Sequence, residues 1–160
     1  MRPADREHWK IISFSGHRNV SLKDESRIVS ATKTLVNNPT IDAMYFGGAL
    51  GADTISLRAA ATYRVGKRPH LVVVCPNTKN HQPVDARKYF HLADEVIELG
   101  YEITRDDGFK AFKLRNEYLV DVASSLVAFY SGKKSSGTGH AVGYAESLGL
   151  AVYKIPVELA

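Results

Sequence analysis

Two consecutive glycines, Gly47 and Gly48, are the residues whose type and spacing most directly indicate binding chemistry. They follow a short apolar run at Ala43–Phe46 and precede a helical pattern from Leu50 to Val65. Glycines at a strand–helix junction let the backbone approach a ligand closely and adopt positive φ without steric cost. The helix behind them directs free N–H groups and the positive end of its dipole toward the turn. We therefore expect a phosphate beside Gly47, Gly48 and Ala49, and an ordinary turn that binds nothing is the alternative.

Two further polar segments have the composition of anion-binding loops. In Ser15-Gly16-His17-Arg18, the guanidinium of Arg18 can clamp a phosphate with two hydrogen bonds, and Ser15 and Gly16 would add hydroxyl or backbone contacts. The second segment runs from Ser135 to Gly139. Its Thr138, with the glycines on either side, would wrap a second anionic group at the start of a helix. The alternatives are a surface charge for Arg18, a plain turn for Ser15 and Gly16, and a flexible loop for the segment around Thr138. The second segment contributes Ser135, Ser136, Gly137, Thr138 and Gly139 to the predicted site.

Three side chains on predicted helices complete the candidate set. Asp53 lies near the first turn of its helix, where it would either bind a ribose hydroxyl or complement the helix dipole. Asn116 lies on an otherwise apolar helix face, and Arg115 precedes it. Asn116 would either touch the ligand or orient a loop by hydrogen bonds.

Two histidines and one cysteine have side chains that could react or bind a metal. His17 and His140 would approach each other across the site as an acid and a base, or as metal ligands. No zinc-type spacing supports the metal, so neither a metal nor a cofactor is expected. Cys75 is expected to be a buried thiol rather than a nucleophile. The sequence carries neither the GxxxxGK[ST] phosphate loop nor a G-x-S-x-G nucleophile turn.

Buried strands and amphipathic helices alternate along the chain. Strands are expected at Lys10–Ser15, Ala43–Phe46, His70–Cys75, Glu95–Leu99, Leu126–Tyr130 and Ala151–Ile155. Helices are expected at Lys23–Asn37, with Ser21 as its N-cap, and at Leu50–Val65, Val84–Leu92, Phe109–Ala123 and His140–Leu148. This alternation predicts an α/β fold, a three-layer sandwich with a mostly parallel sheet. Because ligands of such sheets sit beyond the carboxyl ends of the strands, the candidate segments should converge on one rim.

Length and composition point to a single domain, residues 1–160, with residues 1–9 as an irregular N-terminal arm. The net charge of +4 allows an anionic ligand but is too small to argue for nucleic acid. The longest apolar run, Leu71–Cys75, is far too short for a membrane helix, and Met1–His8 has no apolar core of a signal peptide. With a single cysteine, these features predict a cytoplasmic protein with no membrane partner.

Taken in order, SFSGHR, YFGGALGADTISLRAA, and LRNEYLV followed by SSLVAFYSGKKSSGTGHAVGYAESLGLAVYKIP resemble the SLOG superfamily. It joins the DNA-processing protein A (Smf) family, the YpsA-like proteins and the LOG, or "lysine decarboxylase-like", proteins. The resemblance runs from about Ile11 to Pro156 and is nearest to the YpsA and Smf branches. It implies a Rossmann-like fold that binds nucleotides or nucleotide-derived ligands. The site residues it implies are Ser15, Gly16, Arg18, Gly47, Gly48, Arg115, Asn116, Ser136, Gly137 and Thr138.

Three functions follow from the residues and the resemblance together. The first is binding of a nucleotide or nucleotide-sugar phosphate at the strand ends. The second is single-stranded DNA binding, although Glu117 stands where the DNA-processing family has a basic residue. The third is cleavage of an N-glycosidic bond, although the corresponding stretch, His140 to Val142, contains no counterpart of the LOG glutamate. No catalytic residue is assigned. Relatives suggest a homodimer, which would pair through the helices expected at Leu50–Val65 and Phe109–Ala123.

Overall fold

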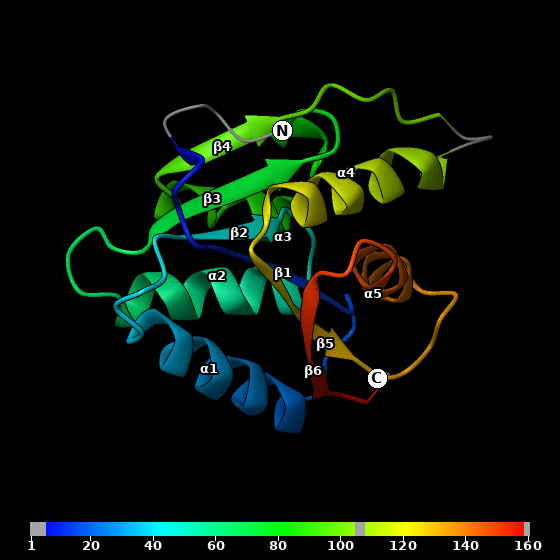
Figure 1. Ribbon diagram of the computed structural model, residues 1–160. Coiled ribbons are helices and arrows are strands. Elements are labelled where there is room, and N and C mark those ends of the chain that lie inside the picture. The colour runs from blue at the N-terminus through cyan, green and yellow to red at the C-terminus, as the bar shows by residue number, and fades with distance from the viewer. Residues whose placement is uncertain (1–5, 105–107, 159–160) are drawn as a thin grey trace.

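The computed structural model describes residues 6–104 and 108–158 of the chain, and the strands in this part form one sheet (Figure 1). The strands are β1 (Ile11–Gly16), β2 (Ala43–Gly47), β3 (His70–Cys75), β4 (Glu95–Glu98), β5 (Ser125–Tyr130) and β6 (Ala151–Pro156). The α-helices are α1 (Leu22–Val36), α2 (Ala52–Tyr63), α3 (Val84–Arg87), α4 (Gly108–Val122) and α5 (Gly137–Ser147). Two short 3-10 helices, η2 (Lys79–His81) and η3 (Phe90–Leu92), flank α3.

The strand order is β4-β3-β2-β1-β5-β6, and every neighbouring pair is parallel. The chain builds the sheet outward from β1 through β2 to β4, and then crosses to the other side of β1 to form β5. The order therefore reverses beside β1, where Gly16 lies opposite Phe129. The predicted three-layer α/β sandwich is confirmed, with a described sheet that is wholly rather than mostly parallel.

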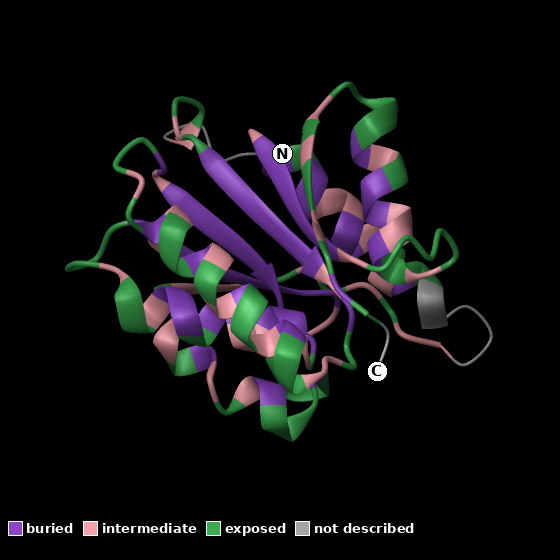
Figure 2. Ribbon diagram, turned by 90° about the horizontal axis from the view of Figure 1, so that it is seen from below, coloured by how far each residue is buried: buried purple, intermediate pink, exposed green. Residues whose placement is uncertain are grey.

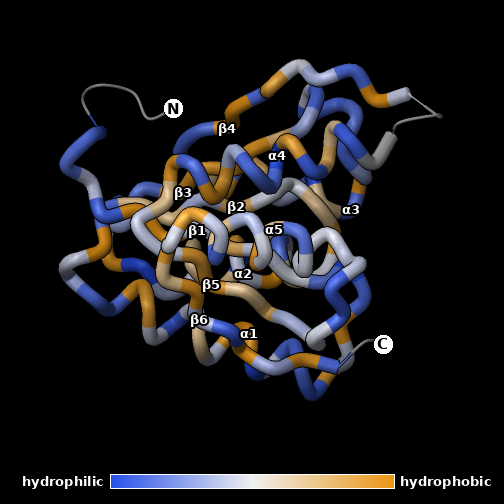
Figure 3. The backbone as a smooth tube through the Cα atoms, turned by 45° about the vertical axis from the view of Figure 1, so that its right-hand side comes forward, coloured by the Kyte–Doolittle hydropathy of each residue, from blue (hydrophilic) through white to orange (hydrophobic). Residues whose placement is uncertain are grey.

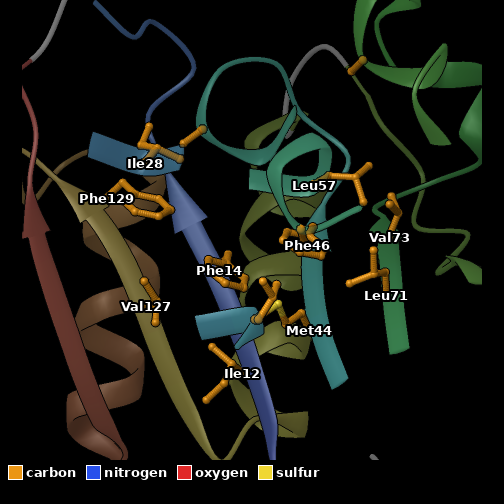
Figure 4. Packing of buried hydrophobic residues seen from close by; sticks show 14 of the residues in the cluster. Ile12, Phe14, Ile28, Met44, Phe46, Leu57, Leu71, Val73, Val127 and Phe129 are labelled. Atoms are coloured by element: carbon orange, nitrogen blue, oxygen red, sulfur yellow. The ribbon is translucent and has the colours of Figure 1, made fainter. Parts of the chain in front are cut away.

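The helices cover the two faces of the sheet in pairs. Helices α1 and α2 pack together on one face, and α4 and α5 pack together on the other (Figure 1). Side chains along β1 alternate between these faces. Phe14 points toward α1 and α2 and stacks on Phe46, with ring centroids 4.9 Å apart (Figure 4). Ser13 points the other way and donates its Oγ hydrogen to the Leu119 carbonyl of α4 at 2.6 Å.

Burial is concentrated in the central strands. Figure 2 shows them as a buried layer between helices whose outer surfaces are exposed. Figure 3 shows the hydrophobic residues gathered along the same strands. The edge strand β6 differs, because its residues are exposed or half-buried. Across the residues that the model describes, no helix has the length and apolar character needed to cross a membrane.

The N-terminal segment packs against the sheet. Arg6 forms an ion pair with Glu95 at 2.6 Å and donates a hydrogen bond to the Tyr45 hydroxyl at 2.9 Å. Its guanidinium also lies 5.0 Å from the ring centroid of Trp9. Of the predicted irregular arm, residues 6–9 therefore lie against β2 and β4, and residues 1–5 lie outside the described residues.

Three predicted helices differ from the observed ones, two of them in where they begin. The helix expected from Leu50 begins at Ala52, because Gly51 has φ of 76° and ends the turn before it. The helix expected from His140 begins at Gly137, because the Ser136 side chain accepts a hydrogen bond from Gly139 N. The single helix expected at 84–92 is instead divided into α3 and η3. Ser21 caps α1 as predicted.

Candidate functional site

A cavity of about 630 Å³ opens at the carboxyl ends of β1 and β5, on the side covered by α4 and α5. It therefore lies where the strand order reverses, the usual ligand position in an open α/β sheet. Its volume falls in the range of small-molecule sites. It is lined by Phe14, Ser15, Gly16, His17, Arg18, Ala49, Asp53, Phe112, Lys113, Arg115, Asn116, Leu119, Lys134, Ser135, Ser136, Gly137, Thr138 and His140.

Backbone contacts join the loop after β1 to the loop after β2. Ala52 N donates a hydrogen bond to the His17 carbonyl at 3.0 Å. At Gly51, a β-carbon would overlap the carbonyl of Arg18, so only glycine allows this approach. The loops after β1 and β2, which carry two of the candidate segments, thus lie side by side at one rim.

His17 joins the first loop to the loop after β5. Its Nε2 accepts a hydrogen bond from the backbone N–H of Ser131 at 2.9 Å, which requires the neutral ring. Burial, together with the charge of Lys133, lowers the pKa of His17 and favours that form. The neutral imidazole of His17 therefore links the loop after β1 to the loop after β5 beside the cavity.

Arg115 and Asp53 form the charged floor of the site. Arg115 is only 4% exposed and Asp53 only 7%. Burial raises the pKa of Asp53 to about 7, although the charge of Arg115 and a hydrogen bond from Ala49 N at 3.3 Å act in the opposite direction. Burial also lowers the pKa of Arg115, against the influence of Asp53. Within the described chain, the buried Arg115 Nη1 has no hydrogen-bond partner.

Asn116 connects this floor to the start of α5. Its Oδ1 accepts a hydrogen bond from Arg115 Nε at 2.9 Å, and its Nδ2 donates one to the Gly137 carbonyl at 3.2 Å. The loop-orienting contact considered for Asn116 is therefore present, and the side chain also lines the cavity.

The loop after β5 presents the N-terminus of α5 to the cavity. Ser136 caps the helix by accepting from Gly139 N at 3.0 Å and donates to the Lys133 carbonyl at 2.6 Å. Thr138, in the first turn, is buried against the cavity. Gly139 does not line the cavity, because its position is set by close packing on the Lys134 carbonyl, 2.5 Å from where a β-carbon would lie.

The structure places the glycine pair outside the lining of the cavity. Neither Gly47 nor Gly48 has positive φ, and neither lines the cavity. A β-carbon on Gly47 would lie 2.6 Å from Asp53 Oδ2, so this glycine makes room for the charged floor. A β-carbon on Gly48 would lie 2.7 Å from Gln82 Nε2, which donates to the Gly48 carbonyl at 2.6 Å. The expected positive φ belongs to Gly51 instead.

Several residues at the cavity lie outside the set of site residues predicted from the sequence. The guanidinium of Arg18 lies 4.9 Å from the ring centroid of Phe112, which forms one wall of the cavity. Phe112 lies one helical turn before Arg115, so its spacing was the available signal. Lys113 and Lys134 add positive charge to the lining. Together with the two arginines, they favour an anionic occupant.

The structure shows the surroundings of His140 and Cys75, two of the candidate reactive residues. His140 lines the cavity, and its Nε2 lies 2.8 Å from Glu117 Oε2. Glu117 is thus engaged by a histidine. Among the described residues, no group of three or more histidine, cysteine, aspartate or glutamate side chains could hold a metal ion. Cys75 is fully buried, and burial raises the pKa of its thiol to about 11, so it is not a nucleophile near neutral pH.

Comparisons with known proteins agree with this fold. No family model matches the sequence. Over 141 residues the chain is 26% identical to the uncharacterized SPbeta prophage-derived protein YoqJ of Bacillus subtilis (strain 168), covering 78% of this chain and 81% of that protein.

Two solved structures share the architecture. DNA processing protein A from Helicobacter pylori, described by its single-stranded DNA binding mode, has a TM-score of 0.72 at 16% identity over 94% of this chain. The chain spans 66% of that protein's length. The molybdenum cofactor binding protein from the phototrophic bacterium Rippkaea orientalis has a TM-score of 0.69 at 15% identity, over 96% of this chain and 80% of that one. At such identities the likeness shows the fold alone. It agrees with the Rossmann-like fold that the resemblance to the SLOG superfamily implied.

Proposed function

We propose that the cavity binds a nucleotide or a nucleotide-derived phosphate ligand, with the anionic group held between Arg115, Arg18 and the start of α5. The observation that carries this proposal is the buried Arg115, whose Nη1 has no hydrogen-bond partner among the described residues. A buried charge without full hydrogen bonding is costly. A ligand anion would offset that cost and complete the site.

Other contacts around the cavity support the same proposal. The first turn of α5 offers backbone N–H groups and the positive end of the helix dipole to an anion. Arg18 is exposed and lies over Phe112 at the cavity wall, where it can reach a ligand phosphate. Ser15, Ser135, Ser136 and Thr138 add hydroxyl groups to the same lining.

Isothermal titration calorimetry with AMP, ADP-ribose and ribose 5-phosphate tests the proposal. Arg18→Gln removes one positive charge from the cavity wall, and we expect it to weaken binding about 10- to 100-fold, since a hydrogen bond to a charged group contributes about 1.5–3 kcal/mol. Lys67→Gln is the matched control, because Lys67 is an exposed cation before β3, at the opposite end of the strands. The proposal is wrong if none of the three ligands binds, or if both variants weaken binding equally.

A second candidate is single-stranded DNA binding. It is favoured by the fold likeness to the Helicobacter pylori protein and by the positive side chains at the cavity, Arg18, Lys113 and Lys134. Binding through phosphates weakens steeply as salt is added. A Kd for an oligonucleotide that stays constant as salt rises, or no complex at low salt, would exclude this candidate.

A third candidate is N-glycosidic bond cleavage, which needs a carboxylate near the anomeric carbon. Asp53 lines the cavity and titrates near neutral pH, as an acid–base group should. Release of free base from nucleoside monophosphates, abolished in Asp53→Asn, would support it. Absence of free base with the wild-type protein would exclude it.

The predicted homodimer, with contacts through residues 50–65 and 109–123, is a separate proposal that light scattering tests.

A further inference from the structure

Asp53 places a carboxyl group in a cavity whose other charged lining residues are arginines and lysines. The carboxyl group lines the cavity, is 7% exposed and lies beside the Arg115 guanidinium. The backbone N–H of Ala49 donates a long hydrogen bond to this carboxyl group, at 3.3 Å. An ionised carboxylate in this position would repel a bound anion strongly, since the surroundings are buried and screen little.

The groups that face Asp53 come from four directions. Burial raises the pKa of Asp53, and Arg115 of α4 and Arg18 of the loop after β1 act in the opposite direction. The backbone N–H of Ala49 and the first turn of α2 also favour the ionised form. On β3, the Cys75 thiol interacts with Arg115, and its pKa of about 11 keeps it neutral. His17 and His140 are the imidazoles in the cavity lining, and Lys113 and Lys134 are its cationic rim.

We propose that Asp53 is the specificity-determining residue of the cavity, which accepts an anion when the Asp53 carboxyl group is protonated and rejects it when the group is ionised. The inference rests on the proposed function and adds its regulation. The geometry supports it because the carboxyl group and the anion-binding guanidinium of Arg115 share one enclosed floor. Gly47 is the residue that makes this possible, since a side chain there would separate them.

The direction of the pH dependence follows from linkage. Burial holds the pKa of free Asp53 at about 7, so below neutral pH the site is already protonated and anion affinity is constant. Above that pKa, binding must take up a proton, and Kd rises by a factor that approaches ten for each pH unit. The effect should be clear between about pH 8 and pH 9, above the ordinary range of imidazole and below the pKa of Cys75.

The test measures binding of sulfate and of ADP-ribose, whose charges do not change near neutral pH, by calorimetry in buffers from about pH 6 to pH 9. We expect Kd to be flat below pH 7 and to rise about tenfold from pH 8 to pH 9. Calorimetry in two buffers of different ionisation enthalpy should show uptake of about one proton above pH 8. Asp53→Asn should remove the pH dependence, whereas His140→Gln should keep it.

The outcomes separate this inference from the proposed function. If neither probe binds at any pH, both fail. If both probes bind with a Kd that is constant from pH 7 to pH 9, the cavity is an anion site and only the role of Asp53 is refuted. The proton-uptake measurement uses the wild-type protein, so the inference stays testable even if Asp53→Asn does not fold.

Discussion

The substitution Gly51→Ala tests whether close approach of two loops builds the cavity. Gly51 has φ of 76° and ψ of −126°, a region of backbone space that glycine alone adopts readily. A β-carbon there would also overlap the Arg18 carbonyl and lie 2.5 Å from the His17 carbonyl oxygen. The loops after β1 and β2 must therefore separate to admit a single methyl group.

Two costs add in this variant. The positive φ alone costs a residue with a side chain about 1–2 kcal/mol. Overpacking against a backbone that must move adds about 1–3 kcal/mol. We therefore expect Gly51→Ala to lower the free energy of unfolding by about 3 kcal/mol, and to lower Tm by roughly 10 °C for a chain of this length. Anion affinity should also fall, because Arg18 and Ala49 would be displaced from the cavity.

Gly149→Ala is the matched control. Gly149 also has positive φ, 72°, but a β-carbon there would have no atom within 4 Å among the described residues. We expect it to cost about 1 kcal/mol and to leave anion binding unchanged. Urea unfolding gives the free energies, and calorimetry with ADP-ribose gives the affinity. Equal destabilisation by the two substitutions would refute the argument that loop contact, rather than backbone conformation, makes Gly51 necessary.

Three further predictions concern stability and reactivity. Ser136→Ala removes the N-cap of α5 and should cost about 1 kcal/mol in urea unfolding, with no loss if the cap is dispensable. Cys75 should react with a thiol reagent far more slowly in the native protein than in urea, and equal rates would contradict its burial. Arg64 and the backbone N–H of Leu71 hold the pKa of Asp94 below its ordinary value, against the effect of partial burial, so its ionised form stabilises the fold at neutral pH and the contribution is lost in acid. Asp94→Asn should therefore be less stable than the wild-type protein at neutral pH, and the difference should shrink in unfolding experiments below about pH 4.

The fold was predictable because its signal is local. Continuous apolar runs such as His70–Cys75 and Leu126–Tyr130 predict strands buried on both faces, and both become inner strands of the parallel sheet. Boundaries were less accurate where a cap or a bend decides them. Ser136 starts α5 three residues early because its side chain, rather than the apolar pattern, satisfies the first N–H groups.

The site was predictable in its position but not in its interior. Strand ends of a parallel sheet meet at one edge, so the loops holding Arg18, Asp53 and Thr138 could be placed together from topology. The packing of Gly47 against Arg115 could not, because these residues are far apart in the sequence and meet only after α4 docks. Gln82 was missed for the same reason, since its bond to the Gly48 carbonyl arises from a segment with weak periodicity.

The absence of side chains at Gly47 and Gly48 is explained by the groups that pack beside them beneath the cavity. Gly47 lacks a side chain where Asp53 and Arg115 need the space, and Gly48 lacks one where Gln82 and Phe90 close the opposite side. A turn shaped only for backbone contact with phosphate would need neither packing relationship. The smallness of these residues therefore serves the packing beneath the cavity. Under the proposal above, anion selectivity depends on the protonation of Asp53 rather than on exposed amide groups at the turn.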